Sequence, residues 1–234
     1  KEDFSKLRKE TLEWLKTQEL AAFCFAGGQM VEEFPGIAIV PLNCGFFALG
    51  LALLQGLVKL NTIHGKYKPK IILTCSPPFR HTHFGGKQRV VHYRTKTTYE
   101  IFSYNLYPGP SAKKGVYGAL IHFGEQEGWV VNHCATVQVI TPYDNKIVIM
   151  HEGASGGGKS EMNEFIHREA EGAILLGTNI VSGQKKYLYI TRTCALRAIS
   201  DDMALCHPSF QKNDGKIHVA DAERGWFIRV DHIK

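Results

Sequence analysis

The sequence predicts a mixed α/β (α+β) fold in which several small sheets pack with helices. The chain has 234 residues, of which 44% are hydrophobic, and this is enough for one large domain or two small ones. Short apolar and β-branched runs bounded by Gly, Pro, Asn or Asp are typical of strands. Segments with apolar residues at helical spacing lie between these runs and indicate helices.

The first sixty residues predict two helices and one strand. Residues 1–20 carry charges throughout and place Phe4, Leu7, Trp14 and Leu15 on one face, as in an amphipathic surface helix. The apolar stretch 36–60 is long enough to cross a bilayer. Because Pro41 and three polar residues interrupt it, we predict a buried strand over 37–40 and a core helix over 46–60, and no membrane association.

Five further strands are predicted, over residues 70–75, 89–93, 99–103, 129–140 and 146–150. The segment PYDN, residues 142–145, predicts a turn between the last two strands. Residues 129–150 are therefore expected to form a hairpin that leads directly into a glycine-rich run. After that run, residues 160–172 contain helix formers, with apolar Met162, Phe165 and Ile166 and with Gly172 as a stop.

The glycine-rich run, HEGASGGGKSEMN, matches the phosphate-binding pattern G-x-x-x-x-G-K-[ST] from Gly153 to Ser160. Glycines let successive backbone N–H groups point at phosphate oxygens without a clash from Cβ. The alternative is a flexible spacer, which rarely stands between a strand and a helix. We therefore expect a nucleotide-binding loop, or P-loop, formed by Gly153, Ala154, Ser155, Gly156, Gly157, Gly158, Lys159 and Ser160.

Two kinds of side chain complete such a site. Lys159 would reach the β and γ phosphates of ATP or GTP, and Ser160 would bind the Mg²⁺ of the nucleotide. A carboxylate at the end of a neighbouring apolar strand usually assists that cation. Asp201 and Asp202 follow the apolar run 195–199 and supply it, although an Asp-Asp pair is also typical of a surface turn or helix cap.

The amino-acid composition limits which classes of ligand and partner the chain is expected to bind. The net charge of +6 and pI near 8.9 suit an anionic ligand. We find no run of five basic residues, so no nucleic-acid arm is expected. The six cysteines lie far apart without a CxxC, which argues against a zinc ribbon and against a disulfide scaffold. We see no signal peptide and expect a cytoplasmic protein.

Residues 107–140 place Tyr107 ahead of Lys113-Lys114-Gly115 and then His133-Cys134-Ala135, before a strand and the P-loop. This order resembles the phosphoenolpyruvate carboxykinases. Lys114 and His133 are 19 positions apart, the separation found in that family. The resemblance implies that Lys114, His133 and Asp202 hold a catalytic Mn²⁺, that Asp201 lies near the nucleotide Mg²⁺, and that Tyr107 binds a small carboxylic acid. A lysine can bind a metal only when neutral, and Lys113 with the metal would lower its pKa.

The P-loop text GASGGGKSE is also similar to that of the HPr kinase/phosphorylases, which act on a protein serine. The expected function is thus a nucleotide-dependent phosphotransferase, with a protein kinase or a non-catalytic nucleotide-binding module as alternatives. We expect a substrate-side domain over 1–105 and a P-loop domain over 106–234, incomplete at its C-terminus, in an uncharacterised bacterial carboxykinase-like family. The oligomeric state is open.

Two departures from the carboxykinase pattern stand out, and a histidine-containing segment needs a separate interpretation. Lys159 and Asp202 are 43 positions apart, so the segment GTNIVSGQKKYLYIT must loop out or add strands. The substrate arginine is not evident, with Arg80 and Arg94 as candidates. His81 and His83 could bind a metal, but a loop with solvated or substrate-facing histidines is favoured because no third ligand lies nearby in the sequence.

Overall fold

The structure is a computed structural model that describes residues 4–30, 32–59, 61, 66–163, 169, 171–190 and 192–225. The chain forms two compact units: unit 1 comprises Lys1–Val131 with Leu205–Lys234, and unit 2 comprises Asn132–Ala204. Helices and several sheets occur together, so the mixed α+β class is confirmed. The division into functional domains over 1–105 and 106–234 stays a prediction.

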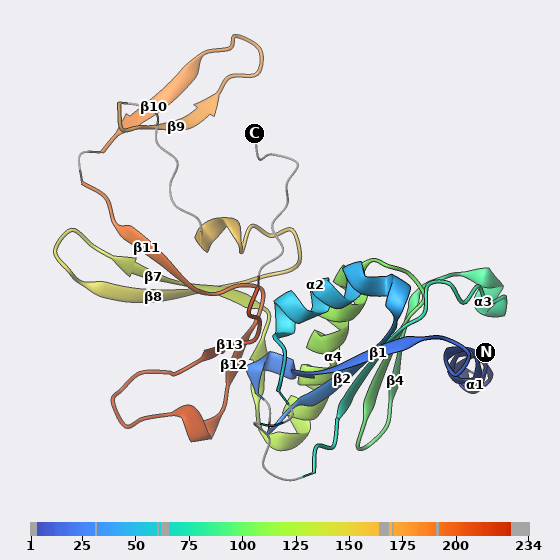
Figure 1. Cartoon of the computed structure of the whole chain (residues 1–234). Helices are drawn as coiled ribbons and strands as arrows, with labels where there is room; N and C mark the ends of the chain where they lie inside the picture. The colour runs from blue at the N-terminus through green and yellow to red at the C-terminus, as the bar shows by residue number, and fades with distance from the viewer. Residues whose placement is uncertain are drawn as a thin grey trace. The chain divides into compact units, whose positions relative to one another are not determined.

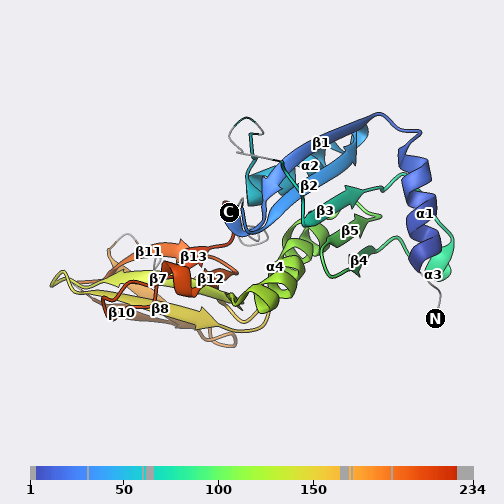
Figure 2. The same cartoon turned by 90° about the horizontal axis from the view of Figure 1, so that it is seen from below.

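Unit 1 contains a five-stranded sheet in the order β1-β2-β3-β5-β4 (Figure 2). β2, β3 and β5 run parallel, whereas β1 and β4 pair antiparallel at the two edges. The predicted strands over 70–75, 89–93 and 99–103 are confirmed. The five strands are β1 (Leu20–Ala26), β2 (Pro35–Pro41), β3 (Ile71–Cys75), β4 (Val90–Arg94) and β5 (Tyr99–Ser103).

Helices cover both faces of this sheet. Side chains of a strand alternate between the two faces, and every residue of β5 is buried, so both faces are covered at β5. On one face Phe102 packs against Leu7 of α1 (Phe4–Leu15). On the other face Ile101 touches α4 (Lys114–Glu127) at Gly115, where an added Cβ would lie 3.1 Å from its side chain. A π-helical turn, Gly109–Lys113, leads into α4, and a short turn labelled α3 spans His83–Gly86. The expected N-terminal surface helix is confirmed.

The second helix, α2 (Gly45–Gln55), is shorter and less buried than predicted. It ends at Gln55 rather than at residue 60, and Val58 instead forms a β-bridge with Cys24. Phe47, Leu51 and Leu54 are buried, but Phe46, Leu49 and Leu53 are 73, 59 and 63% exposed. The prediction of a core helix was therefore wrong for one of its faces. Among the described residues, no helix has the length and apolarity needed to cross a membrane.

Unit 2 contains a three-stranded sheet in the order β11-β7-β8 and a separate hairpin of β9 and β10 (Figure 1). The segment between the P-loop and Asp202 was predicted either to loop out or to add strands, and it adds strands. A short 3₁₀ turn, Glu161–Asn163, follows the P-loop. The strands are β7 (Cys134–Ile140), β8 (Lys146–Glu152), β9 (Ala173–Thr178), β10 (Lys185–Tyr189) and β11 (Ala195–Ser200).

Two predictions around these strands need correction. The strand predicted over 129–140 is interrupted at His133: β6 (Val130–Asn132) pairs with β12 (Ala204–Cys206) in a small sheet with β13 (Ala220–Asp221), and only β7 joins the hairpin with β8. The helix predicted over 160–172 starts as a 3₁₀ turn at Glu161–Asn163, and β9 begins at Ala173, directly after the predicted stop at Gly172. Phe165 and Ile166 lie outside the described residues.

Candidate functional site

Three chain segments of unit 2 meet at one edge of the β11-β7-β8 sheet. β7 is antiparallel to both neighbours, so its first residues lie beside the ends of β8 and β11. Cys134 pairs with Glu152, the last residue of β8, and Thr136 pairs with Ser200, the last residue of β11. The P-loop after β8, the Asp-Asp pair after β11 and His133 before β7 therefore emerge at the same edge.

The P-loop has a defined backbone conformation rather than that of an extended spacer. Gly156 and Gly158 have φ angles of +82° and +83°, which a residue with a Cβ rarely adopts. The N–H of Gly157 donates to the carbonyl of Ala154 over 3.0 Å and closes a turn. The glycines at these positions are thus required by the backbone itself.

Lys159, His133 and Asp202 converge. His133 Nε2 lies 2.8 Å from Asp202 Oδ1, and Lys159 Nζ lies 3.9 Å from the same oxygen. Lys159 is only 7% exposed and also donates to the carbonyl of Ala154 over 3.2 Å. A buried ammonium group held beside a carboxylate and an imidazole is a suitable environment for a phosphate group and a divalent cation.

Asp202 has an unusual backbone. Its φ angle is +61°, and the N–H of Met203 donates to the carbonyl of Asp201 over 2.8 Å, which closes a three-residue turn around Asp202. A non-glycine residue in this conformation costs about 1 kcal/mol or more and is concentrated at functional sites. The turn aims the carboxylate at His133 and Lys159.

A buried polar frame holds this edge together. Ser200 Oγ donates to Thr136 Oγ1 over 2.9 Å, and Asn163 Nδ2 donates to the carbonyl of Ser200 over 2.9 Å. These three side chains were not predicted as site residues. Their signals were present: Thr136 is a polar residue inside an apolar strand, Ser200 precedes the Asp-Asp pair, and Asn163 follows Lys159 at helical spacing.

Cys134 is fully buried at the start of β7, and burial raises the pKa of its thiol. A raised pKa keeps sulfur in the thiol form at neutral pH, which is unfavourable for a nucleophile.

The predicted substrate and lysine residues of the first half belong to unit 1. Lys113 Nζ lies 3.4 Å from Glu223 Oε2, and the side chain of Glu223 is 1% exposed. The ammonium group of Lys114 lies over the ring of Tyr117, 5.6 Å from its centroid. Tyr107 is 69% exposed and Arg80 is exposed, and both follow the carboxyl ends of parallel strands, β5 and β3 respectively. Ligands commonly bind at such strand ends.

The donor chemistry in unit 2 fits a divalent cation. His133 offers an imidazole nitrogen and Asp202 a carboxylate oxygen, and these atoms already lie within 2.8 Å of each other. Over the described ranges, no cluster of three or more His, Cys, Asp or Glu side chains is arranged to hold a metal.

A comparison with family models decides the relationship. One model matches residues 1–234, the whole chain. The chain belongs to DUF4914, a family described as a domain of unknown function. A search of curated proteins gave no match.

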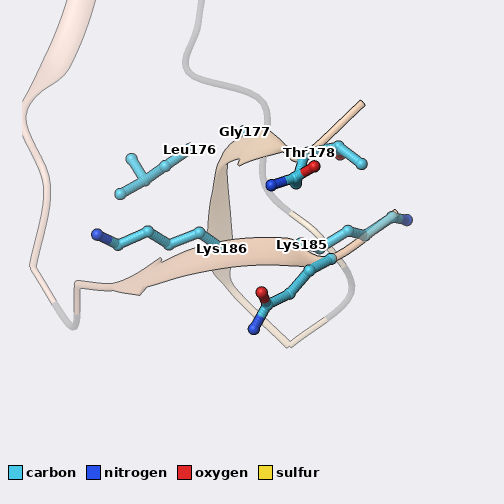
Figure 3. A pocket seen from close by; sticks show the side chains of 7 residues that line it. Leu176, Gly177, Thr178, Lys185 and Lys186 are labelled. Atoms are coloured by element: carbon cyan, nitrogen blue, oxygen red, sulfur yellow. The ribbon is translucent and has the colours of Figure 1, made fainter. Parts of the chain in front are cut away.

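A surface hollow elsewhere in this DUF4914 chain does not belong to the candidate site. It lies on the β9-β10 hairpin and is lined by residues 176–179 and 184–186. Figure 3 shows that the ammonium groups of Lys185 and Lys186 point away from each other. The hollow therefore lacks converging charges, whereas the edge of the β11-β7-β8 sheet has them.

Unit 1 corrects the prediction for the histidine segment. His81 is 6% exposed and stacks edge to face with Tyr104, at 4.6 Å between ring centroids, so it is not solvated. His83 Nε2 lies 2.7 Å from Glu10 Oε2. His81 thus packs against Tyr104, and His83 contacts Glu10 of α1.

Proposed function

We propose that this chain is a nucleotide-dependent phosphotransferase of the carboxykinase-like type, which binds ATP or GTP and acts on a small carboxylic acid. The observation that carries the proposal is the convergence of Lys159, at the end of a P-loop, with His133 and Asp202 on one carboxylate oxygen. These three residues come from separate parts of the chain, and the resemblance assigned them to one site.

The P-loop supplies phosphate binding. The N–H of Gly157 donates to the carbonyl of Ala154 within the loop, and the other backbone N–H groups from Gly153 to Ser160 would bind phosphate oxygens. The ammonium group of Lys159 balances the charge that develops on the transferred phosphoryl group. Ser160, which is exposed, provides a hydroxyl for Mg²⁺.

His133 and Asp202, with Lys114, would hold Mn²⁺, and Asp201 would assist the Mg²⁺ of the nucleotide. A bound cation supplies Lewis-acid stabilisation of negative charge on the acceptor oxygen. Without the cation, His133 Nε2 and Asp202 Oδ1 contact each other over 2.8 Å, and a bound cation would replace this contact. Lys113 would add positive charge, and Tyr107 and Arg80 would bind the carboxylic acid.

The test is nucleotide binding by calorimetry, with Lys159→Ala compared with wild type for ATP and GTP in the presence of Mg²⁺. Loss of a charged hydrogen bond of about 1.5–3 kcal/mol predicts roughly 10- to 100-fold weaker binding. Lys185→Ala, an exposed lysine of the same unit, is the matched control and should bind normally. An unchanged affinity of Lys159→Ala would refute the proposal.

One observation favours the second candidate, a protein serine kinase of the HPr type. Ser160-Glu161 follows Lys159, as in those enzymes. Incubation with labelled ATP, a mixture of small carboxylic acids and cell extract separates the candidates. Label in a small acid supports the first candidate, and label in a protein supports the second. Nucleotide binding without either product indicates a non-catalytic module.

A further inference from the structure

The strand β8 lies at one edge of the β11-β7-β8 sheet, and its side chains are exposed along almost its whole length. The exposed fractions are 54, 54, 42 and 41% for Ile147, Val148, Ile149 and Met150. Side chains of a strand alternate between the two faces of a sheet, so β8 is apolar and open on both faces. An apolar edge strand without proline or a charge in its middle is a template for pairing with another chain.

The hydrogen bonds of the β7-β8 hairpin indicate which backbone groups of β8 face the open edge. The N–H of Thr141 donates to the carbonyl of Asn145 over 2.9 Å. In an antiparallel pair every second residue bonds to the neighbouring strand, so in β8 residues 147, 149 and 151 bond to β7. The N–H and C=O groups that point away from β7 are those of Lys146, Val148, Met150 and Glu152. Among the described residues, no strand pairs with β8 on that side.

The two ends of β8 carry opposite charges, Lys146 at the first position and Glu152 at the last. If two β8 strands pair antiparallel around a two-fold axis at Ile149, Lys146 faces Glu152 of the second copy. Val148 then faces Met150 of the second copy, so all the outward N–H and C=O groups of β8 find partners. Opposite charges directly across a strand pair stabilise it, and a shift of one strand by two residues would separate them. The sequence of β8 is therefore complementary to itself in one antiparallel register.

We propose that two copies of this chain dimerise through their β8 strands and form one continuous sheet across the dimer. The contact uses the same surface on both copies, so it closes after two copies rather than growing into a fibre. One strand from each copy makes a small interface, and we therefore expect a reversible dimer whose population rises with protein concentration. This inference goes beyond the proposed function and does not depend on it.

The first experiment is sedimentation velocity of the full chain over a wide range of concentration. Wild type should shift from monomer to dimer as the concentration rises. Val148→Pro removes an N–H that points at the second copy and leaves the hydrogen bonds between β8 and β7 in place. This variant should stay monomeric at the concentrations where wild type is a dimer, and far-UV circular dichroism should show that it is folded.

The second experiment exchanges the charges, which lie on exposed side chains and should leave folding intact. Lys146→Glu places glutamate opposite Glu152, and Glu152→Lys places lysine opposite Lys146. Each variant alone should dimerise about tenfold more weakly than wild type, because opposite charges are replaced by like charges at both ends of the interface. An equimolar mixture of the two variants should recover the dimer, since each charge then faces its opposite.

Lys185→Glu, an exposed lysine of β10, is the matched control for net charge and should dimerise as wild type does. A wild type that stays monomeric would mean that β8 serves another partner or none, and it would overturn the inference. Open-ended polymers would indicate pairing of β8 with a different edge and would overturn it too. The register would be refuted if the mixture dimerised no better than either variant alone. Failure of the proposed function is recognised separately, as unchanged nucleotide affinity in Lys159→Ala.

Discussion

The two units differ in what they bury. The interior of unit 1 is mostly apolar and aromatic, with Phe25, Phe34, Phe47 and Phe102 all at most 2% exposed. Among the described residues of unit 2, six of the twelve that are buried are polar: Thr136, Lys159, Asn163, Ser200, Asp201 and Asp202. Apolar burial stabilises a fold, whereas buried polar groups are expensive unless they are paired. We therefore expect the interior of unit 1 to contribute more to stability than that of unit 2.

The strands of unit 2 are also more exposed than the central strands of unit 1. All of β10 and nearly all of β8 are exposed, and β9 with β10 forms an isolated two-stranded sheet. Two strands alone contribute little stability in water. We therefore expect unit 2 to lose its structure under milder conditions than unit 1. Tryptophan fluorescence reports on unit 1 specifically, because residues 132–204 contain no tryptophan.

The largest change in the free energy of unfolding is expected for substitutions in the apolar interior of unit 1. Phe47→Ala removes a fully buried ring of α2 and should lower the free energy of unfolding by about 3–5 kcal/mol. Phe46→Ala, one residue earlier but 73% exposed, should change it by less than about 0.5 kcal/mol. Urea unfolding followed by tryptophan fluorescence measures both. Equal costs would remove the distinction between a buried and an exposed face of α2.

A smaller effect is expected in the polar frame of unit 2. Thr136→Val keeps the shape but leaves the hydroxyl of Ser200 without its acceptor, so it should cost about 1–3 kcal/mol. The double variant Thr136→Val/Ser200→Ala removes both partners and should cost less than the sum of the single variants. Far-UV circular dichroism during urea unfolding checks this. Additive costs would mean that the two hydroxyl groups are not coupled.

The smallest expected effect is on the pH dependence of the free energy of unfolding of unit 1. Burial lowers the pKa of His81 below its ordinary value. The unfolded chain then binds a proton at a higher pH than the folded chain, so the free energy of unfolding falls as the pH drops below about 6.5. His81→Gln should show a shallower fall between pH 7 and pH 5, measured by fluorescence. Above pH 8 the same variant reports only the change in packing, and an identical slope to wild type would contradict the prediction.

Local sequence patterns predicted much of unit 1. Tyr99–Ser103 contains the β-branched Ile101 and the aromatic Tyr99 and Phe102, and the strand has those bounds. β1 was not predicted, because its sequence LAAFCFA lacks β-branched residues and its extended form depends on pairing with β2. The apolar residues on both faces of α2 indicated a core helix, and sequence alone does not reveal that one face remains exposed.

The site in unit 2 was partly predictable for a similar reason. The P-loop and the Asp-Asp pair are contiguous motifs, and the strands leading to them were recognised. The break of the strand at His133 was not, because it arises where the chain leaves one sheet for another, which is a feature of pairing rather than of composition. Asn163 was missed because its amide matters only through its contact with Ser200, 37 positions away.

The left-handed turn at Asp202 restricts which amino acids its position can accept over evolutionary time. Asparagine and glycine tolerate such a backbone well, while valine, isoleucine and threonine do not. A descendant that lost the carboxylate would thus be expected to carry asparagine or glycine there, keeping the shape of the turn after its charge had gone. Relatives with either residue at that position would mark lineages in which the backbone conformation is kept without the carboxylate.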